Sequence, residues 1–139
     1  MPLVRGPAAP DWMRDAIAKA QVPEAARAGL YLRAGLWDEA HEAAQAIENA
    51  DGSYWHAIVH RQEPDAGNAS YWFRRVGAHP IFPELARRAA EIEPALAGPW
   101  DPYRFIEYCE AASGEKERRA IAIQQVEWEL LFDHSLQGR

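Results

Sequence analysis

Hydrophobic residues recur at helical spacing along most of this chain. Between residues 115 and 133, Ile123, Val126 and Leu130 recur every three or four positions among charged residues, which is the pattern of an amphipathic helix. β-Branched residues are sparse, whereas the helix-favouring residues alanine, leucine, glutamate and arginine are frequent. The pattern predicts an all-α fold, organised as a compact array of about seven to eight helices.

Proline and glycine divide this pattern into segments. We expect helices at residues 11–20, 23–34, 37–49, 53–63, 67–76, 83–92, 102–112 and 115–133. Prolines stand in the first turn of three of them, where a missing N–H removes no hydrogen bond: Pro23, Pro83 and Pro102. Glycines stand where helices should stop: Gly35, Gly52, Gly77 and Gly114. We expect one all-α domain over residues 1–139, with an extended N-terminus over 1–10 and a frayed tail over 135–139.

Two of the central helices contain the same aromatic motif. The sequence Ser-Tyr-Trp at residues 53–55 recurs at residues 70–72, and a valine follows each tryptophan by four residues. Side chains at i and i+4 lie on one face of a helix. We therefore expect these two helices to pack as an antiparallel hairpin.

The segment over residues 30–48, LYLRAGLWDEAHEAAQAIE, resembles the turn between the two helices of a tetratricopeptide repeat. Gly35, Trp37, Ala40 and Ala44 stand at that family's small and aromatic positions. The family's period of about 34 residues does not run through the chain. The resemblance therefore implies a compact array of TPR-like helical hairpins and not a solenoid.

The charge and the cysteine content limit the partners and the compartment. A net charge of −6 argues against nucleic acid, because phosphate binding relies on clustered lysine and arginine. No segment approaches the roughly 20 apolar residues that span a bilayer, and the N-terminus lacks a signal-peptide pattern. Cys109, the only cysteine, can form no intrachain disulfide and is expected in the core. We expect a cytoplasmic protein that binds neither nucleic acid nor membrane.

Residues 51–80, DGSYWHAIVHRQEPDAGNASYWFRRVGAHP, hold three of the five histidines and five aromatic residues. Histidine, arginine, asparagine and tryptophan are seldom clustered merely to fill a core, so this block is the expected functional region. The block is similar to a WHAxxHRxExDxxNAxYWFRRVGxHP string of an uncharacterised family of small bacterial and fungal proteins. That resemblance implies no particular activity.

His56 and His60 stand one helical turn apart within this block. Such a pair can converge on one ion, and Glu63 can complete a three-ligand site for a divalent metal such as zinc. Ala57 occupies the place of the general base in the zincin motif H-E-x-x-H, so the hydrolytic part of that motif is missing. Pro64 disfavours helical geometry at residue 63 and turns its carboxylate from the histidine face. The alternative is a pair of hydrogen-bonded histidines that line a cleft or pack on tryptophan rings.

On the partner helix, the core stripe leaves Asn68, Tyr71 and Arg75 on its flank. If this flank faces the histidines, the pocket contains three histidines and an arginine and has aromatic walls. Its members are His56, His60, Asn68, Tyr71, Arg75 and His79. Such a pocket suits a carboxylate, a phosphate or a peptide C-terminus held by arginine.

A structural alternative exists for several of these residues. Arg75 can instead pair with Glu63 or Asp65 and fix the helix pair, and Asp65 has the position of a helix cap. His41 lies in an alanine- and glutamate-rich helix and His134 in the fraying C-terminus, so we expect both on the surface. Four scattered tryptophans are expected to anchor helix packing: Trp12, Trp37, Trp100 and Trp128.

These observations leave three hypotheses about function. The first is a binding module whose His/Arg/Trp pocket takes a peptide or a small anionic ligand, because the chain lacks a nucleophile elbow and a phosphate-binding loop. The second is a metal-dependent hydrolase or lyase, in which His56 and His60 bind the ion and Glu63, Asp65 or His79 completes the ligand set. The third is a structural subunit of a larger assembly.

Overall fold

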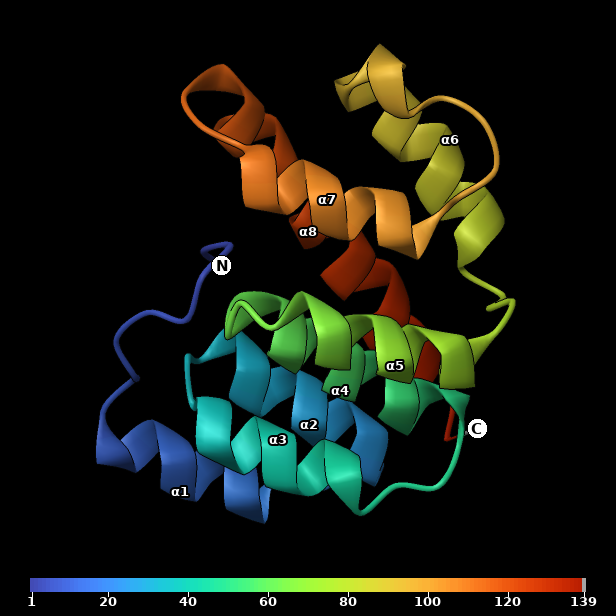
Figure 1. Ribbon diagram of the computed structural model, residues 1–139. Helices are drawn as coiled ribbons and strands as arrows, with labels where there is room; N and C mark the ends of the chain where they lie inside the picture. The colour runs from blue at the N-terminus through green and yellow to red at the C-terminus, as the bar shows by residue number, and fades with distance from the viewer. Residues whose placement is uncertain (139) are drawn as a thin grey trace.

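Eight α-helices and one short 3₁₀ helix make up the fold in the computed structural model, which describes residues 1–138 (Figure 1). They are α1 Asp11–Lys19, α2 Glu24–Arg33, α3 Trp37–Gln45, α4 Ala50–Gln62, α5 Ala66–Val76, α6 Phe82–Ile92, η1 Pro94–Leu96, α7 Pro102–Ala111 and α8 Glu115–Leu136. The described residues contain no strand, so the predicted all-α class is confirmed. Within this part of the chain, no helix combines the length and the apolar character needed to cross a membrane.

Most of the predicted helix boundaries are confirmed. Two glycines end helices as predicted, whereas a third does not. Gly35 and Gly77 have φ of 73° and 66°, the left-handed conformation that ends a helix. Gly52, predicted to end a helix, lies instead in the first turn of α4, which Asn49 caps by accepting a hydrogen bond from the Gly52 N–H at 2.9 Å. Glycine is required there for close approach, because a Cβ would lie 2.4 Å from the carbonyl oxygen of Ile47. Helix α3 therefore ends at residue 45 and not at 49.

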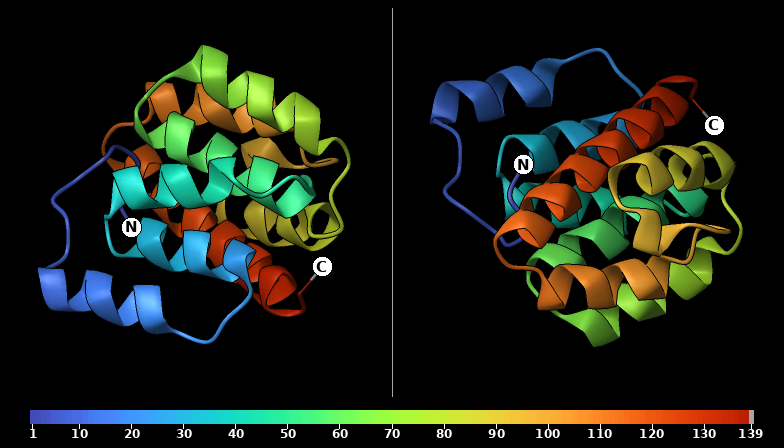
Figure 2. Two further views of the ribbon diagram at one scale, coloured as in Figure 1. Left: turned by 90° about the horizontal axis from the view of Figure 1, so that it is seen from below. Right: turned by 90° about the horizontal axis from the view of Figure 1, so that it is seen from above.

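Helix α4 occupies the centre of the molecule, with α2, α3 and α5 packed around it and α8 crossing it (Figures 1 and 2). Every residue from 51 to 62 is buried. A helix enclosed on all sides is normally apolar all round, yet α4 carries Asp51, His56, His60 and Arg61. Each of these buried polar groups therefore needs a partner on a neighbouring element.

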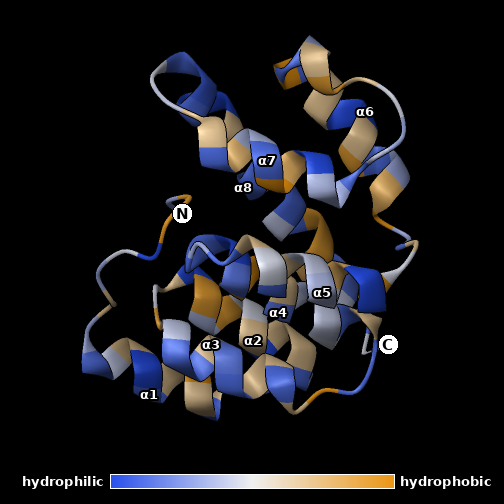
Figure 3. Ribbon diagram, viewed as in Figure 1, coloured by the Kyte–Doolittle hydropathy of each residue, from blue (hydrophilic) through white to orange (hydrophobic). Residues whose placement is uncertain are grey.

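Helices α4 and α5 pack side by side, as the repeated Ser-Tyr-Trp motif predicts, but the two copies are not equivalent. Tyr54 and Trp55 on α4 are fully buried. On α5, Tyr71 is 44% exposed and Trp72 is half-buried. The difference arises because α4 is central, whereas α5 is an outer helix, and hydrophobic and hydrophilic residues alternate along the outer helices (Figure 3).

Both chain ends are tied to the core more tightly than predicted. Residues 1–10 form no helix, as expected, but the Arg5 N–H donates to the carbonyl of Gln62 at 2.8 Å. At the other end, α8 continues to residue 136, and Ser135 is fully buried. Fraying from residue 135 is therefore wrong for Ser135, and the expectation for residue 139 lies outside the described residues. Trp12, predicted to anchor packing, is 66% exposed.

A buried ion pair connects α4 to α8. Arg61 donates to Glu127 through Nη2 at 2.6 Å, and the two side chains are 2% and 0% exposed. The Tyr54 hydroxyl donates to the same carboxylate at 2.8 Å, and Gln124 accepts from Arg61 at 3.2 Å. Gln124 in turn donates to the carbonyl of Pro2 at 3.0 Å, so this network also holds the N-terminal segment.

We expect Glu127→Gln to lower the free energy of unfolding by about 3–5 kcal/mol, because it leaves the Arg61 charge buried without its counter-ion. Adding Arg61→Met removes that charge, so the double variant should lose less than the sum of the single losses, by about 2 kcal/mol. Urea denaturation of the four proteins measures this coupling. Strictly additive losses would show that the pair contributes nothing as a pair.

Candidate metal centre

Three histidine rings from two helices meet on one side of α4. His41 lies on α3, and His56 and His60 lie on α4; we call these residues the three-histidine cluster. The Nε2 atoms of His41 and His56 are 3.1 Å apart, and one ring nitrogen of each histidine lies within 4.8 Å of those of the other two. Tetrahedral zinc with bonds of 2.0–2.1 Å places its ligand atoms about 3.4 Å apart. The three rings are thus close to a coordination geometry.

Local helix geometry produces this convergence. His56 and His60 are at i and i+4 on α4, so their rings stack at 4.9 Å. Helices α3 and α4 form a hairpin, and His41 precedes Glu48 in its turn by seven residues while His56 follows it by eight. Residues nearly equidistant from the turn of an antiparallel hairpin lie opposite each other, which brings His41 to the pair.

Two tryptophans hold the cluster from the sides. Trp37, one turn before His41, stacks on its ring at 5.4 Å and donates to the carbonyl of Val59 at 2.9 Å. Trp72 of α5 stacks on His56 at 3.9 Å with an interplanar angle of 18°. These contacts restrict the rings to one orientation, which is what a preorganised ligand set requires.

Glu63 lies behind the cluster. It follows the last residue of α4, and its Oε1 is 2.9 Å from Nδ1 of His60. The carboxylate does not turn away from the histidines as predicted, because it contacts Nδ1 of His60. A carboxylate on Nδ1 fixes the proton there and leaves the Nε2 lone pair free for a ligand, which is the usual outer-shell arrangement of a metal-bound histidine.

The surroundings favour neutral imidazoles. Burial, followed by the nearby His41 and His60, lowers the pKa of His56 to about 3. Burial and the neighbouring His60 also lower the pKa of His41, although Glu63 partly opposes this. Metal ions bind neutral imidazole, so these lowered pKa values favour the ligating form of His41 and His56 at neutral pH.

His56 also shows an unusual feature for a core residue. Its Nδ1 is buried and has no hydrogen-bond partner among the described residues. Its other nitrogen faces a second imidazole, and only one of these two nitrogens can carry the shared proton. A buried ring with one nitrogen unpaired is a poor structural element, because an unsatisfied buried polar atom is destabilising.

The flank of α5 predicted to complete the pocket lies largely elsewhere. Asn68 is exposed and contacts Asp65, the N-cap residue of α5. Its Nδ2 donates to one carboxylate oxygen of Asp65 at 2.7 Å, and its backbone N–H donates to the other at 3.1 Å. Tyr71 is exposed, and the guanidinium of Arg74 lies 6.0 Å from its ring centre. Arg75 pairs with neither acidic residue of the connecting turn, since its guanidinium lies over the Trp72 ring at 5.4 Å. Of the three, Tyr71 and Arg75 contact Trp72, which stacks on His56, and none contacts a histidine of the cluster directly.

His79 belongs to a second polar cluster, around the buried carboxylate of Asp51. Its Nε2 lies 2.7 Å from Asp51, while its Nδ1 accepts the N–H of Ile81 at 3.2 Å. His134 and Ser135 contact the other carboxylate oxygen at 2.9 and 3.0 Å. Burial alone would raise the pKa of Asp51, but these hydrogen bonds lower it. Both ring nitrogens of His79 are engaged in these contacts. The Asp51 cluster joins α4 to α8, and His79 does not take part in the three-histidine cluster.

Two expectations about histidines are therefore wrong. His41 and His134 were expected on the surface, but both are half-buried and hydrogen-bonded. A usable signal for His41 existed in the sequence, since Trp37 and His41 are spaced by four residues and a short turn separates them from the His56 pair. For His134 no comparable signal was present.

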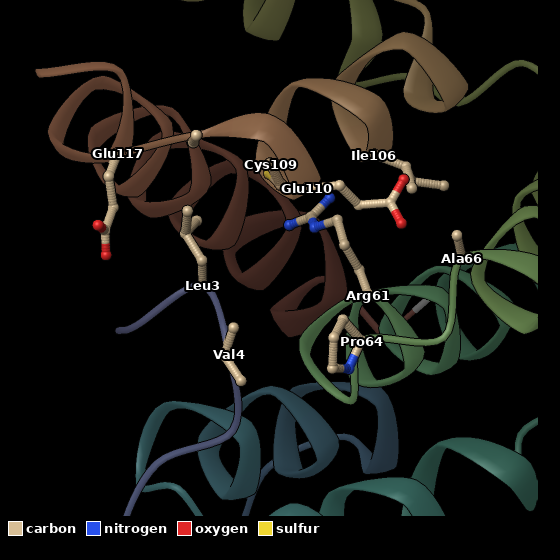
Figure 4. A pocket seen from close by; sticks show the side chains of 10 residues that line it. Leu3, Val4, Arg61, Pro64, Ala66, Ile106, Cys109, Glu110 and Glu117 are labelled. Atoms are coloured by element: carbon tan, nitrogen blue, oxygen red, sulfur yellow. The ribbon is translucent and has the colours of Figure 1, made fainter. Parts of the chain in front are cut away.

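A cavity of about 290 Å³ is lined by Arg61, Cys109, Glu110 and Glu117 among apolar residues, and it contains no histidine (Figure 4). Arg61 points into it but is committed to Glu127. Burial raises the pKa of the Cys109 thiol to about 11, so this cysteine is not a nucleophile at neutral pH. The predicted packing role of Cys109 agrees with its half-buried position.

No protein-family model, no curated protein and no solved structure matches this chain. The resemblances to tetratricopeptide repeats and to the family with the WHAxxHR string stay predictions.

The lowered histidine pKa values predict a loss of stability in acid. With His56 neutral, the folded state binds fewer protons than the unfolded state, whose histidine pKa is about 6.5. The contribution of His56 to the free energy of unfolding is therefore complete above a pH of about 6.5. It declines as the pH falls toward the pKa of the folded state, by at most about 1.4 kcal/mol per pH unit for each histidine with a lowered pKa. Denaturant midpoints of chelator-treated protein from pH 8 to pH 5 should therefore fall more steeply for the wild type than for His56→Gln. Parallel curves would contradict the pKa assignment.

Proposed function

We propose that this protein binds a zinc ion, or a similar divalent metal, through His41, His56 and His60, and that it is a metal-dependent hydrolase or lyase. One observation carries the proposal: three imidazoles from two helices converge, with a carboxylate on Nδ1 of one of them. Three protein ligands that leave a fourth position open are typical of catalytic zinc, whereas structural zinc usually has four.

The proposal changes the ligand set expected from the sequence. We now assign Glu63 as a positioning residue for His60 and no longer as the third ligand. His41 becomes the third ligand. Asp65 is the cap of α5, and His79 is bound to Asp51. We therefore propose neither as a ligand of this centre, although each belongs to another group of side chains close enough together to hold an ion.

The residues of this chain would divide the work as follows. His41, His56 and His60 would hold the ion, which would supply a water of lowered pKa as the nucleophile. The two tryptophans hold the rings, and their apolar surface keeps bulk water from the ligands. Glu63, 42% exposed at its side chain, keeps the proton of His60 on Nδ1 and increases the basicity of that ligand.

A binding module without catalysis is the second candidate. It is favoured by the open groove beside Trp72 and Arg75, which has polar walls and no identified nucleophile. The metal centre would then serve to fix α3 against α4.

We expect protein purified without a histidine tag to carry about one equivalent of zinc or a related metal, measured by elemental analysis. His41→Ala, His56→Ala and His60→Ala should each remove it. Glu63→Gln should weaken zinc affinity by about 10- to 100-fold while leaving the ligands in place. A cobalt-substituted protein should show the visible absorption of a tetrahedral site.

His134→Ala provides the matched control, since it removes a half-buried histidine outside the cluster. It should keep the metal even though it loses a contact to Asp51. A wild-type protein that holds less than about a tenth of an equivalent of metal, and that zinc does not stabilise, would refute the metal centre. A zinc-loaded protein without chelator-sensitive activity on esters, amides and phosphoesters would leave the binding module as the function.

A further inference from the structure

A groove of about 780 Å³ lies beside the three-histidine cluster. One wall is the connection between α3 and α4, with Glu48 and Asn49, and the facing wall is α5, with Trp72 and Arg75. Ser53, near the start of α4, also lines it. None of the residues expected from the sequence except Arg75 takes part, so the groove is a different surface from the pocket predicted on the hairpin.

Helix geometry places this groove next to the histidines. Gln45 lines the groove and follows His41 by four residues on α3. Ser53 precedes His56 by three residues on α4. Positions three and four apart lie on the same face of a helix, about 5–6 Å apart along its axis. A molecule in the groove would therefore lie within one helical turn of the ligand atoms.

Trp72 is shared between the groove and the cluster. Its ring stacks on His56 at 3.9 Å, and the guanidinium of Arg75 lies 5.4 Å from the centre of the same ring. Stacking on the indole holds the guanidinium in place without using its hydrogen-bond donors. Among the described residues, no carboxylate lies within 4.0 Å of Arg75, whereas Arg87 and Arg118 elsewhere on the surface are paired with glutamates.

The residues that line the groove suit a ligand that has one oxyanion group and an uncharged polar part. A guanidinium with free donors binds a carboxylate or a phosphate bidentately. The side chains of Gln45, Asn49 and Ser53 offer amide and hydroxyl groups for an uncharged polar part of the ligand. Glu48, on the wall opposite Arg75, disfavours a second negative charge there.

We propose that this groove binds the substrate of the metal centre, a small molecule with one oxyanion group, and that Arg75 holds that group. The inference rests on the proposed function, because it assigns the substrate class of the same centre. Arg75 is thus a specificity-determining residue. It does not contact the histidine ligands itself, and the Trp72 ring contacts both its guanidinium and His56.

The test is isothermal titration of zinc-loaded and chelator-treated protein with three probes: N-acetylglycine, inorganic phosphate and the neutral N-methylacetamide. Wild type should bind at least one of the two anions and not the neutral amide. Tighter binding of N-acetylglycine would identify a carboxylate substrate, and tighter binding of phosphate a phosphate ester. Arg75→Gln should weaken anion binding by at least about tenfold, which corresponds to the loss of a charge-assisted bidentate contact.

Arg74→Gln is the matched control, because Arg74 is the adjacent arginine on the same helix but lies over Tyr71, outside the groove. It should bind as wild type does, and both variants should keep their zinc. Equal anion binding by wild type and Arg75→Gln, or equal losses in both variants, would overturn the proposal. Arg75-dependent binding by a chain that takes up no zinc would sustain the groove and overturn the metal centre, so the two failures are distinguishable.

Discussion

The burial of α4 is the constraint on which the rest of the structure depends. This helix lies inside the fold while carrying Asp51, His56, His60 and Arg61, and a polar group removed from water without a partner is strongly destabilising. Each of its faces is therefore matched by a different element. Hydrophobic burial alone would not position α3 and α8 so specifically, since apolar surfaces are tolerant of sliding and polar contacts are directional.

The three polar faces of α4 differ in how completely they are satisfied. The ion pair of Arg61 with Glu127 and the Asp51 cluster engage most of their donors and acceptors within the protein. Nδ1 of His56 is buried without a hydrogen-bond partner among the described residues, as is Nε of Arg61, and His56 also faces His41 nitrogen to nitrogen, where only one of the two atoms can carry the proton. The three-histidine cluster is therefore the least completely satisfied of the three faces. It adjoins the groove with Arg75 through Trp72.

Preorganisation connects the cluster to function. The rings of His41 and His56 are stacked on tryptophans, and His60 is held through Glu63, so little rearrangement is needed to bring their nitrogens to a common ion. The folding of the hairpins that carry the three imidazoles offsets the free-energy cost of gathering them in a largely buried site. This preorganisation supports the proposed metal binding, because apolar residues of similar volume would stabilise the core more.

The sequence by itself determined the all-α class and most helix boundaries, because helical periodicity and the conformational preferences of proline and glycine are local properties. It also identified His56 and His60, whose spacing within one helix fixes their proximity. Only the tertiary structure decided that His41 joins them, that Glu63 stands behind His60, and that His79 belongs to Asp51. These pairings depend on how α3 and α8 pack against α4, and Gly52 shows why: its role is set by the approach of Ile47 and not by its own helix.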